Sequence, residues 1–194
     1  MQINLLSMAN VVIVHGTGGS PEGNWFPWLK SELEGYGCQV FVPRFPTPLG
    51  QSLEKWLEIF NEYERYLNKD AIIVGHSLGT AFLLSVLERI DHPVRAAYFV
   101  AGFTGLLDNP DFDVLNRTFT VKAFDWNKIK RNCMHFYVIN SDNDPYVPVQ
   151  KGIDLARDLN VEPAVLRNAG HINRDSGYVE FGFLAKSIRE EIKN

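Results

Sequence analysis

Cysteine is scarce in this sequence: only Cys38 and Cys133 occur among 194 residues. A small secreted domain held together by disulfides would use more, so we expect two reduced, buried thiols. The five histidines form no HExxH motif, and neither cysteine belongs to a CxxC pair. Such patterns mark zinc sites, and their absence leads us to predict no metal and no other cofactor.

Positive charge and long apolar runs are also limited. The 19 lysines and arginines are outnumbered by 23 acidic residues, for a net charge of −4, which argues against a nucleic-acid partner. No apolar run approaches the roughly 20 residues that cross a bilayer. The first ten residues lack the basic segment and the cleavage site of a secretory signal. We therefore expect a cytoplasmic protein with neither a nucleic-acid nor a membrane partner.

Hydrophobic residues make up 45% of the chain, enough to bury a core, and they follow two alternating patterns. Short β-rich runs, typical of buried parallel strands, cover residues 11–14, 40–42, 71–74, 94–100, 137–140 and 163–167. Helical stripes of apolar residues cover residues 25–33, 51–67, 80–90, 149–159 and 178–192. Strands that alternate with helices predict an α/β fold, with a mostly parallel sheet of about six strands and helices on both faces. We expect one domain over residues 1–194, with residues 1–8 as a disordered extension.

The segment from Gly102 to Lys122 differs from the rest because it has no clear period and is rich in Asp, Asn, Thr and Phe. Irregular segments of this length in compact domains are usually functional or mobile. We expect it to form a small lid, with an otherwise minimal cap over the sheet.

Residues 75–79 read Gly-His-Ser-Leu-Gly, a G-x-S-x-G pattern between a predicted strand and a predicted helix. That setting is typical of a nucleophile elbow, in which a serine occupies a sharp turn whose neighbours must be small. The helix that follows points its free N–H groups at the reaction centre. The pattern makes Ser77 a candidate nucleophile; the alternative is a tight strand-to-helix turn without chemistry.

A serine hydroxyl needs a neighbouring base, and chains with this elbow carry the acid and then the histidine downstream of the serine. Three histidines follow Ser77: His92, His135 and His171. His92 ends a predicted helix and His135 starts a strand, whereas His171 follows the last strand beside Gly170. We predict His171 as the general base. Activity should then fall below roughly pH 6.5, where an unperturbed imidazole gains a proton.

The acid should follow the preceding strand, where two carboxylates compete, Asp142 and Asp144. Asp144 is followed by Pro145 and a turn into a helix, which makes its position rigid. Asp142 lies nearer the strand, where its side chain can cap the turn. We favour Asp144 as the residue that holds the histidine tautomer and stabilises the imidazolium.

An oxyanion site needs two N–H donors. One is expected from Leu78, which follows the nucleophile, and the other from Thr17 in the glycine-rich loop after the first strand. Glycines there let the backbone approach a substrate closely. His15 in the same loop is expected to be structural, and the loop lacks the lysine of a Walker phosphate site.

The motifs in combination resemble a known family. HGTGG, the tryptophan-rich NWFPWL, GHSLG, SDNDPYVP and AGHIN are together similar to the small serine hydrolases of the YdeN and retinoblastoma-binding-protein type. The similarity covers essentially the whole chain and implies an α/β-hydrolase fold without a large cap. It also implies Ser77, Asp144 and His171 as a catalytic triad, since each lies in a matching motif. Esterase and aminopeptidase-like activities are associated with the group, and its human-type members with protein binding.

These residues predict a serine hydrolase that cleaves a small carboxylic ester or amide through an acyl-enzyme intermediate. Trp25, Phe26 and Phe103 are candidates for lining an apolar acyl pocket; the alternative is that they belong to the ordinary core. A function of another class is also open: a protein that binds a partner on a hydrolase scaffold with little or no catalysis. No motif in the sequence supports a particular protein partner.

Overall fold

The β-rich runs form one parallel sheet in the computed structural model, which describes residues 9–193. The six strands lie in the order β2-β1-β3-β4-β5-β6, and every neighbouring pair is parallel. The strands are β1 (Asn10–Val14), β2 (Gln39–Phe41), β3 (Ile72–His76), β4 (Val94–Val100), β5 (Cys133–Ser141) and β6 (Ala164–Leu166). The predicted α/β fold with a parallel sheet is confirmed.

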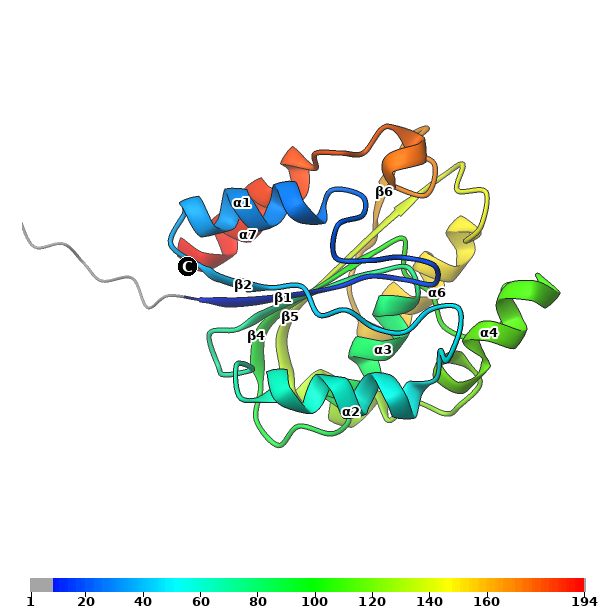
Figure 1. Ribbon diagram of the computed structural model, residues 1–194, viewed down its shortest axis with the longest axis horizontal. Coiled ribbons are helices and arrows are strands. Elements are labelled where there is room, and N and C mark those ends of the chain that lie inside the picture. The colour runs from blue at the N-terminus through cyan, green and yellow to red at the C-terminus, as the bar shows by residue number, and fades with distance from the viewer. Residues whose placement is uncertain (1–8, 194) are drawn as a thin grey trace, which may run out of the picture.

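Helices cover both faces of this sheet, as Figure 1 shows. One face carries α1 (Phe26–Gly35) and α7 (Gly182–Lys193); the other carries α2 (Leu53–Glu64), α3 (Leu78–Leu87), α5 (Trp126–Arg131) and α6 (Val149–Leu159). Side chains alternate along a strand, so in β1 Val11 and Ile13 join the first layer, while Val12 and Val14 join the second. This double coverage explains why the central strands are apolar on both faces.

Helix α3 is buried along its whole length. It packs on the sheet, and α2, α4 (Pro110–Thr120) and α5 also contact it. Because α3 follows β3 directly, its N-terminus lies at the carboxyl end of the central strands. In parallel α/β sheets this edge is where sites form.

The expectation of an irregular segment over residues 102–122 is wrong in part, because α4 occupies Pro110–Thr120. Asn109 caps this helix by accepting hydrogen bonds from the next two backbone N–H groups, and Pro110 occupies its first turn. Both residues are strong helix-start signals. The short helix α5 was also missed by the sequence pattern. Residues 102–109 remain without regular structure.

Both cysteines are unpaired and buried, and burial raises the pKa of each thiol. None of the helices within residues 9–193 is long and apolar enough to span a membrane. The expectation for residues 1–8 lies outside the described part of the chain.

Candidate active site

Ser77 lies in the sharp turn between β3 and α3, with φ 54° and ψ −122°. A positive φ is strained for a residue with a side chain, and the surrounding glycines permit the turn. A Cβ atom on Gly75 would lie 2.8 Å from the Gly79 carbonyl, and one on Gly79 would lie 2.4 Å from the Val14 oxygen. The backbone therefore has the geometry expected of a nucleophile elbow.

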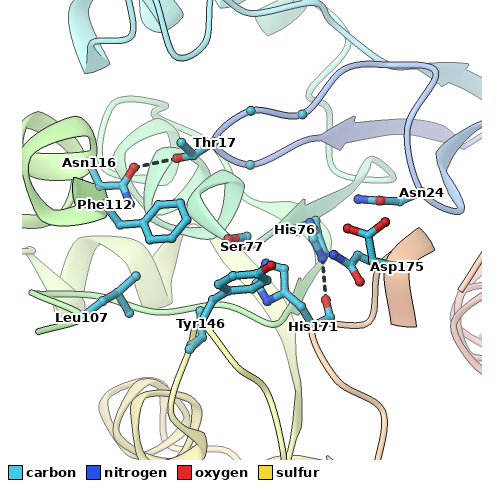
Figure 2. Close-up of a pocket in the computed structure, with 15 residues that line it drawn as sticks. Thr17, Asn24, His76, Ser77, Leu107, Phe112, Asn116, Tyr146, His171 and Asp175 are labelled. Atoms are coloured by element: carbon cyan, nitrogen blue, oxygen red, sulfur yellow. Dashed lines mark hydrogen bonds between the residues drawn. The ribbon is translucent and has the colours of Figure 1, made fainter. Parts of the chain in front are cut away.

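A cavity of about 290 Å³ lies at the carboxyl edge of the sheet, and both Ser77 and His171 line it (Figure 2). The glycine-rich loop after β1 forms one wall, and α4 forms another. Within the described residues, no hydrogen bond joins Ser77 to His171. In ligand-free enzymes such contacts are often long and tighten only when a substrate binds.

The His171 ring is oriented by a carboxylate. Its Nδ1 lies 2.8 Å from Oδ2 of Asp144, whose side chain has no exposed surface. The other oxygen of Asp144 accepts the backbone N–H groups of Tyr146 and Val147 at 2.8 and 3.0 Å. These bonds fix the orientation of the carboxylate. With Nδ1 engaged, Nε2 is the ring atom left to exchange a proton.

Asp142, the competing acid, does not contact the imidazole. Its Oδ1 accepts the backbone N–H of Asn168 at 2.8 Å, and Asn143 accepts that of Gly170 at 2.8 Å. Both bonds tie the loop after β5 to the loop after β6 that carries His171. Asp142 therefore braces the loop in which the histidine lies.

His76, the residue before Ser77, is a cavity residue that the sequence reasoning did not weigh. It is buried and lines the cavity, its Nε2 lies 3.0 Å from the backbone oxygen of His171, and the two rings are 4.9 Å apart. Burial, together with the nearby charge of His171, lowers the pKa of His76 to about 3. Its ring is therefore neutral at physiological pH. The position of His76 inside the G-x-S-x-G pattern is the sequence signal that could have identified it as a cavity residue.

The two residues expected to supply oxyanion donors lie after Ser77 and in the cavity wall, respectively. Leu78 is the first residue of α3, and the first N–H groups of a helix have no partner within the helix. Thr17 lines the cavity, and its backbone N–H has no hydrogen-bond partner among the described residues. Gly16 approaches so closely that a Cβ there would lie 2.8 Å from that of Ser77.

His15 is buried and does not line the cavity. Its Nε2 accepts the backbone N–H of Phe45 at 3.2 Å, so the proton lies on Nδ1, which donates to the Gly16 carbonyl at 2.9 Å. Burial lowers the pKa of His15. The neutral ring thus fixes the glycine-rich loop.

The expectation that Trp25, Phe26 and Phe103 line a pocket needs correction. All three are buried to 1% exposure or less, and none lines the cavity. Trp25, the N-cap of α1, and Phe26, its first residue, pack edge-on against His76 in the core layer between the sheet and helices α1 and α7. Their large side chains fill the space between the sheet and this helical layer, and they contact His76, the residue before Ser77.

The other histidines lie elsewhere. His92 contacts Asp91 and the backbone of Leu67, and His135 lies 2.8 Å from Glu191 on α7. Neither lines the cavity. Within residues 9–193, no three His, Cys, Asp or Glu side chains are grouped to hold a metal ion.

The remaining cavity walls come from residues to which the sequence reasoning assigned no role, although Asn24, Val147 and Asn173 lie in the quoted motifs. Apolar side chains on one side are Leu107, Phe112 and Val147, while Asn24, Asn173 and Asp175 lie toward the η1 turn (Arg174–Ser176). Figure 2 shows Phe112 and Asp175 on opposite sides of Ser77. Among the described residues, no lysine or arginine lines the cavity.

A strained serine after a central parallel strand, with an Asp–His pair at the same sheet edge, defines the α/β-hydrolase class. The family comparison is more specific. The chain belongs to the serine hydrolase family, whose model matches residues 11–189.

Two relatives match most of the chain. YdeN of Bacillus subtilis (strain 168) is 34% identical over 170 residues, which cover 87% of this chain and 88% of that protein. The serine hydrolase RBBP9 of Rattus norvegicus is 29% identical over 170 residues, or 86% and 89% of the two chains. The predicted resemblance is thus confirmed.

Solved structures agree with this assignment. The crystal structure of the B. subtilis ydeN gene product has a TM-score of 0.90 and 30% identity, covering 96% of this chain and 100% of that one. A structure reported for the metagenome-derived lipolytic enzymes LipS and LipT has a TM-score of 0.76 and 16% identity, covering 96% and 94%. The second match shows the shared fold alone.

Proposed function

We propose that this chain hydrolyses a small carboxylic ester or amide through an acyl-enzyme intermediate on Ser77. The observation that carries the proposal is the 2.8 Å contact between His171 Nδ1 and the buried Asp144 carboxylate, beside the cavity that Ser77 lines. Membership of the serine hydrolase family supports it independently. A scaffold used only for binding has no need of a strained serine and an oriented imidazole.

In the first half of the reaction, the Ser77 oxygen attacks the substrate carbonyl carbon and His171 Nε2 takes the hydroxyl proton. The N–H groups of Thr17 and Leu78 bind the resulting oxyanion. When the tetrahedral intermediate collapses, the bond to the leaving group breaks, and the leaving alcohol or amine takes the proton from His171. Asp144 stabilises the imidazolium between these steps without accepting its proton.

Water completes the cycle. It attacks the acyl carbon, gives a proton to His171, and releases the carboxylic acid while the proton returns to Ser77. Each half-reaction uses the same oxyanion site. No cofactor is needed for this chemistry.

The cavity walls favour a particular kind of substrate. Its volume of about 290 Å³ suits a small molecule. Among the described residues, Asp175 is the only aspartate or glutamate that lines it, and no lysine or arginine there offsets its charge. The electrostatics therefore favour neutral or cationic substrates over those that carry a carboxylate.

A serine-directed fluorophosphonate probe tests the proposal, followed by a panel of acyl esters and aminoacyl amides. We expect the wild-type protein to be labelled, and Ser77→Ala to be unlabelled while its circular dichroism spectrum is unchanged. Folded wild-type protein that takes up no probe and turns over no substrate would contradict the proposal and favour a binding role.

A further inference from the structure

Asn116 on α4 is a polar residue with 2% exposure that lines the cavity. Burial of an amide side chain is costly unless its polar atoms find partners. Its Oδ1 has two: the Thr17 hydroxyl donates to it at 2.6 Å, and Gln51 Nε2 lies 3.0 Å away. These contacts join α4 to the glycine-rich loop.

The orientation of the Asn116 amide follows from its neighbours. Gln51 Nε2 also lies 2.9 Å from the backbone oxygen of Leu115, and a carbonyl oxygen only accepts hydrogen bonds. The Gln51 atom on this side must therefore be the NH₂ group. The Asn116 atom that faces it must be the oxygen, so the Asn116 NH₂ group points the other way.

That NH₂ group has no hydrogen-bond partner among the described residues. It is nevertheless not sealed in the core, because the one fully buried side-chain polar atom that lacks a partner in residues 9–193 is Oδ1 of Asn140. Asn116 Nδ2 thus keeps access to the cavity that its residue lines. The site holds a fixed, unused hydrogen-bond donor.

The donor lies on the acyl side of the proposed reaction. His171 must hand a proton to the leaving group, so the leaving group lies on the side of His171. Asn116 and His171 lie on opposite sides of Ser77 in Figure 2, and the side chain of Asn116 contacts Thr17, whose N–H is a proposed oxyanion donor. The acyl group therefore extends toward α4, between Phe112 and Leu107.

We infer that Asn116 is a substrate-binding residue whose NH₂ group donates a hydrogen bond to an uncharged oxygen within the acyl group. The inference rests on the proposed function and narrows its substrate class to apolar acyl chains that carry a carbonyl, ether or hydroxyl oxygen. An anionic oxygen is disfavoured, since no described cation lines the cavity.

Two esters that differ by one oxygen test this assignment: p-nitrophenyl pentanoate and p-nitrophenyl 4-oxopentanoate. The readout is the ratio of their kcat/KM values, each corrected for spontaneous hydrolysis. Asn116→Asp keeps the acceptor for Thr17 and Gln51 but replaces the donor, whereas Asn116→Leu removes both. A structural defect or an added charge near the oxyanion slows both esters alike and leaves the ratio unchanged.

We expect the ratio of the oxo ester to the plain ester to fall about three- to tenfold in both variants, the range that one net hydrogen bond contributes. Thr118→Val is the matched control. Thr118 lies on the same helix but accepts the N–H of Leu53 at 3.0 Å, outside the cavity, so its ratio should match that of the wild type.

Hydrolysis with the same ratio in wild type, Asn116→Asp and Asn116→Leu would overturn this inference and leave the proposed function standing. No turnover of either ester by wild-type protein, together with no fluorophosphonate labelling of Ser77, would overturn both.

Discussion

The His76 ring donates a hydrogen bond from Nε2 to the backbone carbonyl of His171, at 3.0 Å. The carbonyl can only accept, so the proton lies on Nε2. The bond joins the residue before Ser77, the proposed nucleophile, to the loop that carries His171, the proposed base. A positive charge on His76 is disfavoured by burial and by His171, which together lower its pKa to about 3.

This low pKa predicts how stability depends on pH. The unfolded chain binds a proton at His76 below about pH 6.5, while the folded protein does not until about pH 3. The contribution of His76 is therefore complete above about pH 6.5 and is lost as the pH falls toward 3. Each pH unit in that window costs about 1.4 kcal/mol, or about 2 kcal/mol between pH 6.5 and 5.

The measurement is the free energy of unfolding in urea at several pH values, for the wild type and for His76→Gln. The glutamine can still donate to the His171 carbonyl but does not titrate, so its stability should fall less steeply below pH 6.5. Burial also lowers the pKa of His15, and the comparison cancels that contribution. Parallel stability curves for the two proteins would refute the account of His76.

Replacement of Asp144 tests the orientation of the base. Asp144→Asn allows the wrong tautomer of His171, and we expect kcat to fall about 10³-fold or more. Asp142→Asn is the matched control: Asp142 contacts Asn168 and not the imidazole, so its kcat should stay within about threefold. Steady-state kinetics decide the matter, and equal losses in the two variants would contradict the assignment of Asp144.

The charge of Asp175 should affect substrate choice. It is exposed and lies on the His171 side of the cavity (Figure 2), so it acts on the leaving group. We expect a choline ester to react about three- to fivefold faster in kcat/KM than its uncharged 3,3-dimethylbutyl isostere at low salt. High salt should reduce that preference.

Asp175→Asn should abolish the preference. Glu180→Gln removes an equal charge from an exposed residue that does not line the cavity, and it should retain the preference. A preference that survives Asp175→Asn would show that another group recognises the cation.

Mutations of Phe103 and Phe112 distinguish effects on the core from effects on the cavity. Phe103 has 1% exposure and belongs to the core, whereas Phe112 on α4 lines the cavity and packs against Tyr146. Phe103→Leu should lower the free energy of unfolding by about 1 kcal/mol and leave the acyl-chain preference unchanged. Phe112→Leu should change that preference severalfold. Thermal melts and an ester series of increasing chain length measure both effects, and the reverse pattern would contradict the placement.

Local sequence signals predicted the sheet and the elbow well. The β-branched runs of β1 and β3 form buried strands, and Gly75 and Gly79 are required by close backbone contacts around the turn. Chain order after a strand selected His171 and Asp144, whose side chains the structure places 2.8 Å apart. Helix α4 was missed because Asn116, a polar residue, occupies a buried position and interrupts the apolar stripe that identifies a helix.

The residues that form the cavity walls could not be predicted from the sequence, for a different reason. Tyr146 and Asp175 come from separate loops, and only the folded chain brings them to one cavity. Trp25 and Phe26 were placed wrongly because a large aromatic residue near a reactive loop fits a core and a pocket equally well. Which of the two it joins depends on how the rest of the chain packs around it.

The most direct test of Ser77 as the nucleophile is the detection of its covalent intermediate. Wild-type protein is mixed with p-nitrophenyl pentanoate, quenched in acid within milliseconds to seconds, and examined by intact-mass and peptide mass spectrometry. We predict a pentanoyl adduct on the peptide that contains Ser77, and neither adduct nor turnover in folded Ser77→Ala. Turnover by Ser77→Ala at the wild-type rate, or an adduct on another residue, would show that Ser77 is not the nucleophile.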